Sequence, residues 1–444
     1  MTEVAFLSQP GSKAALGMST FAFTACFAVW TVFSIIGIKI KQDLGLNEAQ
    51  FGLLAGTPIL TGSLIRVPLG IWADQKGGRL VNLAVMLSAA LATWLLSYAH
   101  TYPQFLLAAL GVGIAGGSFS VGVAYVSKFF SKARQGTALG IFGAGNVGAA
   151  VTKFAAPFVM LAYGWETVAQ VWSSVLAVIA LLYFFTTQDD PELVERRRTG
   201  TKATPALMQL EPLRKLQVWR FALYYFFSFG AFVALSLWLP HYLVAVYKLP
   251  LIAAGMLAAA YSIPGSLFRI FGGWLSDLIG ARRVMYVTFG VSVVCTFLLS
   301  YPATTYIVDG IEGPITFRLA LGLGPFVVLL FCLGFAMSLG KAAVFKHIPV
   351  YYPETIGSVG GLVGMIGGLG GFILPIAFGA LNDLTHVWTS CFMLLFVLVA
   401  SALAWMHLAI RRMERARTPA LRELPELPEM ADLQPNPAPS QAAK

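Results

Sequence analysis

Apolar runs as long as a lipid bilayer is thick recur along this chain. The stretches 80–98, 171–187 and 389–410 approach or exceed the roughly 18 apolar residues that a helix needs to cross a membrane. Overall, 57% of the residues are hydrophobic and only 11% are charged, whereas a soluble protein carries about 25% charged residues. A water-soluble fold could not cover this much apolar surface, so we expect the lipid bilayer to be the main partner of the chain.

The apolar runs fall into two sets of six. The twelve predicted spans lie near residues 18–39, 50–73, 80–99, 103–127, 136–160, 168–187, 219–245, 251–276, 283–302, 316–345, 357–381 and 388–410. The polar segment 188–218 predicts a cytoplasmic linker between an N-terminal six-helix bundle, 1–187, and a C-terminal one, 219–410. The Pro-, Glu- and Ala-rich segment 411–444 predicts a disordered cytoplasmic tail. The expected fold class is an all-α membrane protein with twelve transmembrane helices.

The basic residues indicate the orientation of these spans. With both termini placed in the cytoplasm, the cytoplasmic segments before the last residue carry twenty-one lysines and arginines, and the opposite side carries only Lys39, Lys41, Lys248 and Arg318. This bias follows the positive-inside rule. Because the basic residues lie between apolar runs and not along one polar face, the net charge of +10 does not indicate nucleic-acid binding.

An internal repeat relates the two halves. Arg, Gly, Asp, Gly and Arg recur with the same spacing 203 residues apart, at Arg66, Gly70, Asp74, Gly77, Arg79 and at Arg269, Gly273, Asp277, Gly280, Arg282. The repeat predicts two pseudo-symmetric bundles in which Arg66 and Arg269 are equivalent. Asp74 and Asp277 end their spans in tight glycine turns, and we expect them to latch one conformation, although a loop that only sets topology is the simpler reading.

Arg66 and Arg269 are the residues most indicative of function. Each precedes its cytoplasmic Asp by eight residues, about 12 Å along a helix, and therefore lies well inside the bilayer. An arginine there costs about 2.5–3.5 kcal/mol. No Asp or Glu falls inside the predicted spans, so an anion is the expected counter-ion, and the planar guanidinium suits a planar oxyanion. Backbone carbonyls are the alternative partners.

Glycines crowd the predicted fifth and eleventh spans. The first run is Gly140-Ile-Phe-Gly143-Ala-Gly145-Asn146-Val-Gly148, and the second is Gly361-Leu-Val-Gly364-Met-Ile-Gly367-Gly368-Leu-Gly370-Gly371. Small residues at this spacing let helices approach closely. Packing alone explains most of them. Their occurrence in equivalent spans of both halves favours helices that slide or rock during conformational gating.

Together, the paired arginines and the two glycine runs resemble the nitrate/nitrite porters of the NarK type, through nearly the whole membrane region. The resemblance implies the major facilitator fold, a bacterial inner-membrane location, and nitrate and nitrite as cargo. It also implies that Arg66 and Arg269 clamp the anion between the rings of Phe119 and Phe229. The remaining implied ligand residues are Tyr225 and Asn146, and the implied gating glycines are Gly140, Gly143, Gly145, Gly148, Gly364, Gly367, Gly368 and Gly371.

The mode of coupling stays open at this point. Two arginines without a titratable partner favour nitrate/nitrite antiport, in which another anion occupies the site on the return step. Lys153 and Lys341 also fall within predicted spans, and a desolvated lysine can lose its proton, so nitrate/proton symport through Lys153 is the alternative. A small organic monocarboxylate is the alternative cargo, because it too would need arginines.

Other classes of protein fit the sequence less well. An enzyme would need a nucleophile, a metal cluster or an acid/base pair, yet the five histidines are scattered and no carboxylate pair lies within the spans. Four cysteines on separate apolar runs indicate neither a disulfide nor a metal site, and we expect no cofactor. An anion channel or sensor suits the arginines equally well, but the duplicated halves favour a carrier. We expect a monomer.

Overall fold

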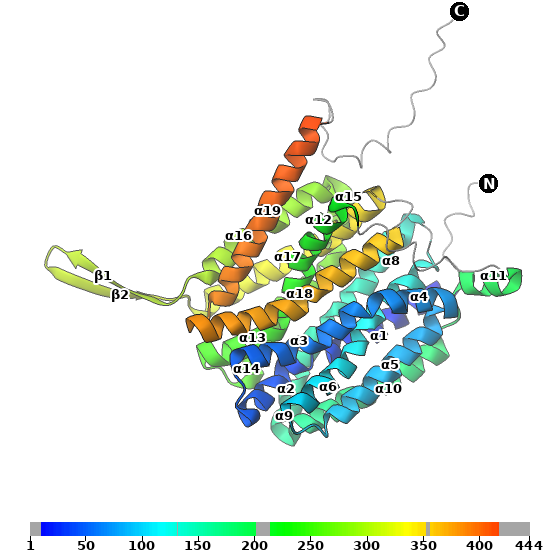
Figure 1. Cartoon of the computed structure of the whole chain (residues 1–444), viewed down its shortest axis with the longest axis horizontal. Helices are drawn as coiled ribbons and strands as arrows, with labels where there is room; N and C mark the ends of the chain where they lie inside the picture. The colour runs from blue at the N-terminus through cyan, green and yellow to red at the C-terminus, as the bar shows by residue number, and fades with distance from the viewer. Residues whose placement is uncertain (1–9, 131, 201–213, 352–355, 417–444) are drawn as a thin grey trace, which may run out of the picture.

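The computed structural model describes residues 10–130, 132–200, 214–351 and 356–416. It is a bundle of antiparallel helices in two halves (Figure 1). The N-terminal half contains α1 Ser12–Trp30, α2 Phe33–Leu44, α3 Glu48–Leu64, α4 Arg66–Lys76, α5 Gly78–Leu96, α6 Tyr102–Val112, α7 Ser118–Ser127, α8 Lys132–Gly143, α9 Gly148–Tyr163 and α10 Trp165–Thr186. The C-terminal half contains α12 Leu216–Tyr225, α13 Phe232–Tyr247, α14 Leu251–Leu267, α15 Arg269–Ile279, α16 Ala281–Ser300, α17 Leu323–Tyr351, α18 Ile356–Thr385 and α19 Ser390–Ala416.

The predicted number of twelve spans is confirmed. Within the described residues, eleven helices are long and apolar enough to cross a membrane, and α14 and α15, which meet at a 40° bend, supply the twelfth. Six spans fall in each half. Because successive spans alternate in direction, both described chain ends lie on one face, which we call the proximal face. The opposite face, which carries the turns at 45–47, 97–101 and 248–250, is the distal face.

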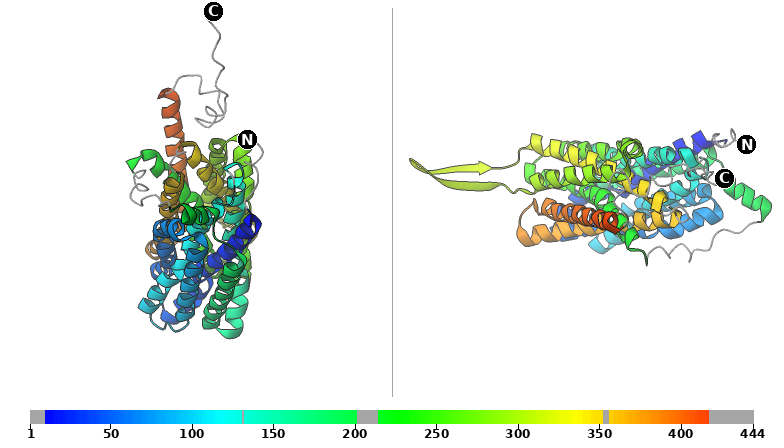
Figure 2. Two further views of the ribbon diagram at one scale, coloured as in Figure 1. Left: turned by 90° about the vertical axis from the view of Figure 1, so that its right-hand side faces the viewer. Right: turned by 90° about the horizontal axis from the view of Figure 1, so that it is seen from above.

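The structure departs from the sequence prediction in two places. The tenth span does not begin near 316, because two antiparallel strands, β1 Thr304–Gly310 and β2 Gly313–Leu319, occupy that region. Their β-branched and aromatic residues favour strands, and the hairpin projects from the helical body (Figure 1, Figure 2). The helix α19 continues to Ala416, past the predicted end at 410, because its Arg, Met and Glu residues favour a helix. The rest of the predicted tail, 417–444, lies outside the described residues.

The segment between the two halves is partly helical. The predicted linker contains a short helix, α11 Pro191–Thr199, whose N-terminus is capped by the side chain of Asp190. Residues 201–213 of the linker fall outside the described part of the chain. Asp190 also lies 3.7 Å from the ammonium of Lys128, so α11 is held against the proximal end of the N-terminal half.

The two halves are in backbone contact near the distal face. A Cβ added to Gly52 or Gly56 of α3 would strike the backbone carbonyls of Pro375 and Phe372 in α18, and one added to Gly379 would strike that of Glu48. Glycine therefore lets α3 and α18 touch along their distal parts.

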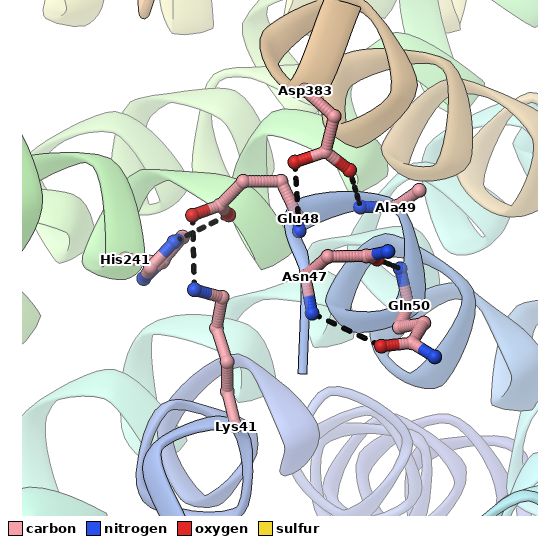
Figure 3. Close-up of polar contacts among 7 residues, drawn as sticks. All are labelled: Lys41, Asn47, Glu48, Ala49, Gln50, His241 and Asp383. Carbon is pink, nitrogen blue, oxygen red and sulfur yellow. Dashed lines mark hydrogen bonds and ion pairs between the residues drawn. The ribbon is translucent and has the colours of Figure 1, made fainter. Parts of the chain in front are cut away.

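A cluster of charged groups closes the same interface (Figure 3). The carboxylate of Asp383 in α18 accepts hydrogen bonds from the backbone N–H groups of Glu48 and Ala49, at 3.1 and 2.9 Å, and so caps α3 of the other half. Glu48 in turn lies 2.9 Å from the ammonium of Lys41 and 2.8 Å from Nε2 of His241 in α13. We call Lys41, Glu48, His241 and Asp383 the distal latch. A carboxylate at a helix N-terminus is favoured by the exposed N–H groups and the helix dipole.

We expect neutralisation of the distal latch to open the distal face. In the variant Glu48→Gln/Asp383→Asn the charge-assisted hydrogen bonds, each contributing about 1.5–3 kcal/mol, are weakened, so the open population should rise about tenfold or more. The measurement uses a background that lacks the native cysteines. Cysteines would replace Tyr163 and Lys248, one on the distal face of each half, and spin labels on them would report the distance between the two halves. Asp43→Asn is the matched control, since among the described residues Asp43 pairs with Lys39 alone, in an exposed contact within one half. An unchanged distance distribution in the double variant would contradict a latch.

Candidate functional site

Breaks in the helices, about midway along the spans, position the predicted site residues. Arg66 begins α4 directly after the break at Ile65, and Arg269 begins α15 directly after the bend at Phe268. Phe119 follows a 3-10 turn, Gly113–Gly117, and Asn146 lies in another, Ala144–Val147. Phe229 lies in a π-helical segment, Phe226–Ala231. Interruptions of this kind inside a membrane are tolerated where the backbone is buried in protein, and they often mark functional sites.

Each arginine reaches across to the glycine-rich helix of the other half. Arg66 is 3% exposed, and its Nη1 donates to the carbonyl oxygen of Gly364 in α18 at 2.7 Å. Arg269 is 6% exposed, and its guanidinium lies so close to Gly143 in α8 that an added Cβ would be 3.1 Å from Cζ. The backbone-carbonyl alternative raised by the sequence therefore holds for one nitrogen of Arg66. Glycine at 143 and 364 leaves room for the two guanidinium groups.

Aromatic rings surround both guanidinium groups. The Cζ atom of Arg66 lies 5.2 Å from the ring centre of Phe119 and 5.3 Å from that of Phe229. The Cζ atom of Arg269 lies 5.7 Å from the same Phe119 ring. The two predicted rings and the two arginines thus form one connected cluster, with Phe119 shared between the halves. Contacts of this kind stabilise a cation by about 0.5–2 kcal/mol.

Sequence reasoning missed two rings of this cluster. Trp30 lies 5.8 Å from Cζ of Arg66, and Phe345 lies 5.7 Å from Cζ of Arg269. Trp30 also donates from Nε1 to the carbonyl of Pro58 at 2.8 Å, which ties α1 to α3. Both residues stand in long apolar runs, where an aromatic side chain usually means core or lipid packing. No signal in the sequence separates Trp30 or Phe345 from the other aromatic residues of these runs.

Several buried polar groups at the site have no hydrogen-bond partner among the described residues. These are Nε of Arg66, Nη1 of Arg269, the hydroxyl of Tyr225, both amide atoms of Asn146 and Oγ of Ser63. The Tyr225 ring stacks on Phe229, at 5.0 Å and 9°. Asn146 lies three residues beyond Gly143 and makes no hydrogen bond to the arginine cluster. A buried polar group without a partner costs about 1–3 kcal/mol, so these donors are set up for a ligand or water.

The charge of the site is positive and uncompensated. Within the described part of the chain, no ion pair joins Arg66 or Arg269 to a carboxylate. A third buried cation, Lys341 in α17, donates to the carbonyl of Gly265 at 2.5 Å and lies 3.3 Å from the Phe232 ring centre. The described residues contain no group of three potential metal ligands. A small anion is therefore the chemistry that this arrangement supports best.

The predicted gating residues occupy four kinds of place. Gly143, Gly364, Gly367 and Gly368 line the site, because an added Cβ would meet Arg269, Arg66, Tyr225 or Ser63. Gly145, Gly148 and Gly371 pack against neighbouring helices, whereas Gly140 faces open space. At the proximal face, Asp277 accepts a hydrogen bond from Lys346 at 2.5 Å. Asp74 lies in α4, and its side chain is outside the described part of the structure.

Comparison with known proteins places the chain among transporters. The Major Facilitator Superfamily model matches residues 18–325. The chain is 41% identical to the "Probable nitrate/nitrite antiporter NarK1" of Thermus thermophilus, over 91% of this chain and 93% of that protein. It is 31% identical to the "Nitrite extrusion protein" of Bacillus subtilis, over 88% and 94% of the two chains.

A solved structure supports the fold. A bacterial homologue of the human lysosomal transporter Spinster, in an inward-facing and occupied conformation, superimposes with a TM-score of 0.68. The alignment covers 91% of this chain and 98% of that chain at 16% sequence identity. At that identity the likeness shows the fold alone. This fold agrees with the two six-helix bundles that the sequence predicts.

We expect Gly367→Ala to weaken anion binding at least tenfold. The added methyl group would overlap the Tyr225 ring. The ring would lose its stacking on Phe229 and move away from the Arg66 side of the site. The matched control is Gly361→Ala on the same helix, where an added Cβ meets nothing within 4 Å. The readout is the nitrate-dependent rise in the thermal midpoint of the purified protein. Equal responses of the two variants would show that Tyr225 does not line the anion site.

Proposed function

We propose that this chain, which belongs to the nitrate/nitrite porters of the NarK type within the Major Facilitator Superfamily, exchanges nitrate and nitrite across the bacterial inner membrane by alternating access. The observation that carries the proposal is the pair of buried arginines, one from each half, which have unpartnered donors and form no ion pair with a carboxylate of the described residues. An anion bound between them supplies the missing counter-charge. The names of the relatives support nitrate and nitrite as that anion.

The site favours a small planar oxyanion. Charge-assisted hydrogen bonds from the free nitrogens of Arg66 and Arg269 contribute about 1.5–3 kcal/mol each. The apolar ring faces of Phe119 and Phe229 form two walls of the site. A flat, weakly hydrated anion loses little hydration free energy when it moves from water to such a surface. The hydroxyl of Tyr225 supplies a further donor. Asn146 lies one turn beyond the arginine cluster, where its amide serves the anion directly or through water.

The bond between Arg66 and Gly364 supports exchange. The Arg66 guanidinium donates to the Gly364 carbonyl of the opposite half, so this bond joins the two halves. An anion offers Arg66 a charged acceptor in place of this neutral carbonyl and gives Arg269 the partner it lacks. Binding therefore releases a contact that resists rearrangement, and the carrier changes conformation most readily when it is loaded.

Nitrate/proton symport is the second candidate, and it rests on Lys153. The Lys153 ammonium is fully buried and bonded to neutral groups only, which is a suitable setting for a proton carrier. We prefer exchange because, in the described part of the chain, no carboxylate pairs with either arginine and could carry a proton beside the anion. In both cases we propose that both termini are cytoplasmic, which makes the distal face the outer one, and that the chain works as a monomer.

We expect nitrite uptake into proteoliposomes to be stimulated by internal nitrate or nitrite, compared with empty vesicles, and to be insensitive to an imposed pH gradient. Arg66→Lys and Arg269→Lys should each reduce exchange at least a hundredfold, since lysine keeps the charge but loses the planar fork. Arg318→Lys, in the exposed β2 strand, is the control. Uptake driven by the gradient into empty vesicles would establish symport. Transport of acetate or lactate, but of neither nitrogen oxyanion, would establish the organic-anion alternative.

A further inference from the structure

Lys153 is a buried cation that joins the two halves between the arginine site and the distal face. It lies on α9, seven residues beyond Asn146, which is about 10 Å along the helix. Its side chain is completely inaccessible, although α9 belongs to the N-terminal half and faces α14 of the C-terminal half. An added Cβ on Gly255 of α14 would strike the Lys153 carbonyl oxygen, so the two helices are in backbone contact at this level.

All partners of the Lys153 ammonium are uncharged oxygens. Nζ donates to Ser236 Oγ of α13 at 2.5 Å, to Ser262 Oγ of α14 at 2.9 Å, and to the carbonyl of Ala149, one turn back on its own helix, at 3.3 Å. The two serine hydroxyls also bond each other at 3.0 Å. Two of the three contacts cross between the halves, and opening of the distal face must break both of them.

A neutral side chain would hold two serine hydroxyls without the cost of burying a charge. The closed state therefore gives no reason for a lysine here, and the reason must come from a state in which the ammonium has another partner. In that open state the ammonium faces the distal path to the arginine site with two of its three N–H donors released. A small anion coming from that side would meet it before Arg66 and Arg269.

We propose that Lys153 forms a second anion site on the distal path, which takes a small monovalent oxyanion when the distal face is open and passes it to the arginine pair. The inference rests on the proposed transport function and deepens it. Ser236, Ser262 and the anion compete for the same N–H donors, so the distal face closes over Lys153 only after the anion has moved on. Because of this competition, the distal face closes after the anion has bound between Arg66 and Arg269.

Lys341 shows that burial alone does not define such a site. Its partners, Gly265 in α14 and Phe232 in α13, belong to the same half as α17, on which Lys341 lies. Separation of the halves leaves those contacts in place, so the Lys341 ammonium gains no free donor when the distal face opens. Among the buried lysines of the described residues, Lys153 is the one whose contacts cross between halves.

The test compares the half-saturating nitrite concentration from each side of the membrane. Membrane vesicles of right-side-out and inside-out orientation are loaded with saturating nitrate, and external nitrite is varied. We expect Lys153→Gln to raise the half-saturating concentration about tenfold from the distal side only, with maximal exchange within about twofold of the unmodified protein. Ser236→Ala/Ser262→Ala, which removes the two contacts of Lys153 across the interface but keeps the ammonium, should leave that concentration unchanged or lower it.

A charge-rescue experiment keeps the proposal testable if Lys153→Gln does not accumulate. Lys153→Cys modified by aminoethyl methanethiosulfonate regains an ammonium and should regain distal affinity, whereas methyl methanethiosulfonate should not restore it. Equal changes from both sides, or equal effects of the two reagents, would show that Lys153 is only a structural contact, and would overturn the proposal. Failure of the unmodified chain to exchange either anion would instead refute the proposed function.

Discussion

Two guanidinium groups, buried near the middle of a membrane protein without a carboxylate partner, determine how the rest of this structure is organised. Each comes from an equivalent position in one half and reaches the glycine-rich helix of the other. Burial of such charges is costly, and aromatic rings and a backbone carbonyl offset only part of the cost. We therefore propose that both arginines serve a ligand of opposite charge, and that the position of this ligand between the halves couples its binding to their relative movement.

The closed distal face explains why coupling is possible. Above the site, glycines bring α3 and α18 into backbone contact, Asp383 caps the opposite half, and Lys153 bonds to two serines across the interface. These contacts hold one arrangement of two rigid bundles by a limited set of polar bonds. We propose that these bonds break and form again as the two bundles move during alternating access.

The burial of the two arginines, the twelve spans and the duplication could be predicted from the sequence. They depend on charge, on the length of apolar runs and on residue spacing, all of which can be read directly from the order of the residues. Phe119, Phe229, Tyr225 and Asn146 came from a family resemblance, since 33 phenylalanines give no physical reason to choose two. Trp30 and Phe345 were missed for that same reason. The hydrogen bond from Arg66 to the Gly364 carbonyl could not be predicted. Every residue carries a backbone carbonyl, and only the fold determines which of these carbonyls faces Arg66. The β-hairpin was missed because its apolar residues resemble the start of a span.

The central claim is that Arg66 and Arg269 hold one anion between them, and a double-mutant cycle on nitrate binding tests it most directly. Isothermal titration of the purified protein would give the nitrate dissociation constants of the unmodified chain, Arg66→Lys, Arg269→Lys and the double variant. If one anion uses both groups, each single change removes most of the binding energy and the second adds little, so the two effects are strongly non-additive. Independent, additive losses would contradict the account, because they would mean that the two arginines do not share a ligand.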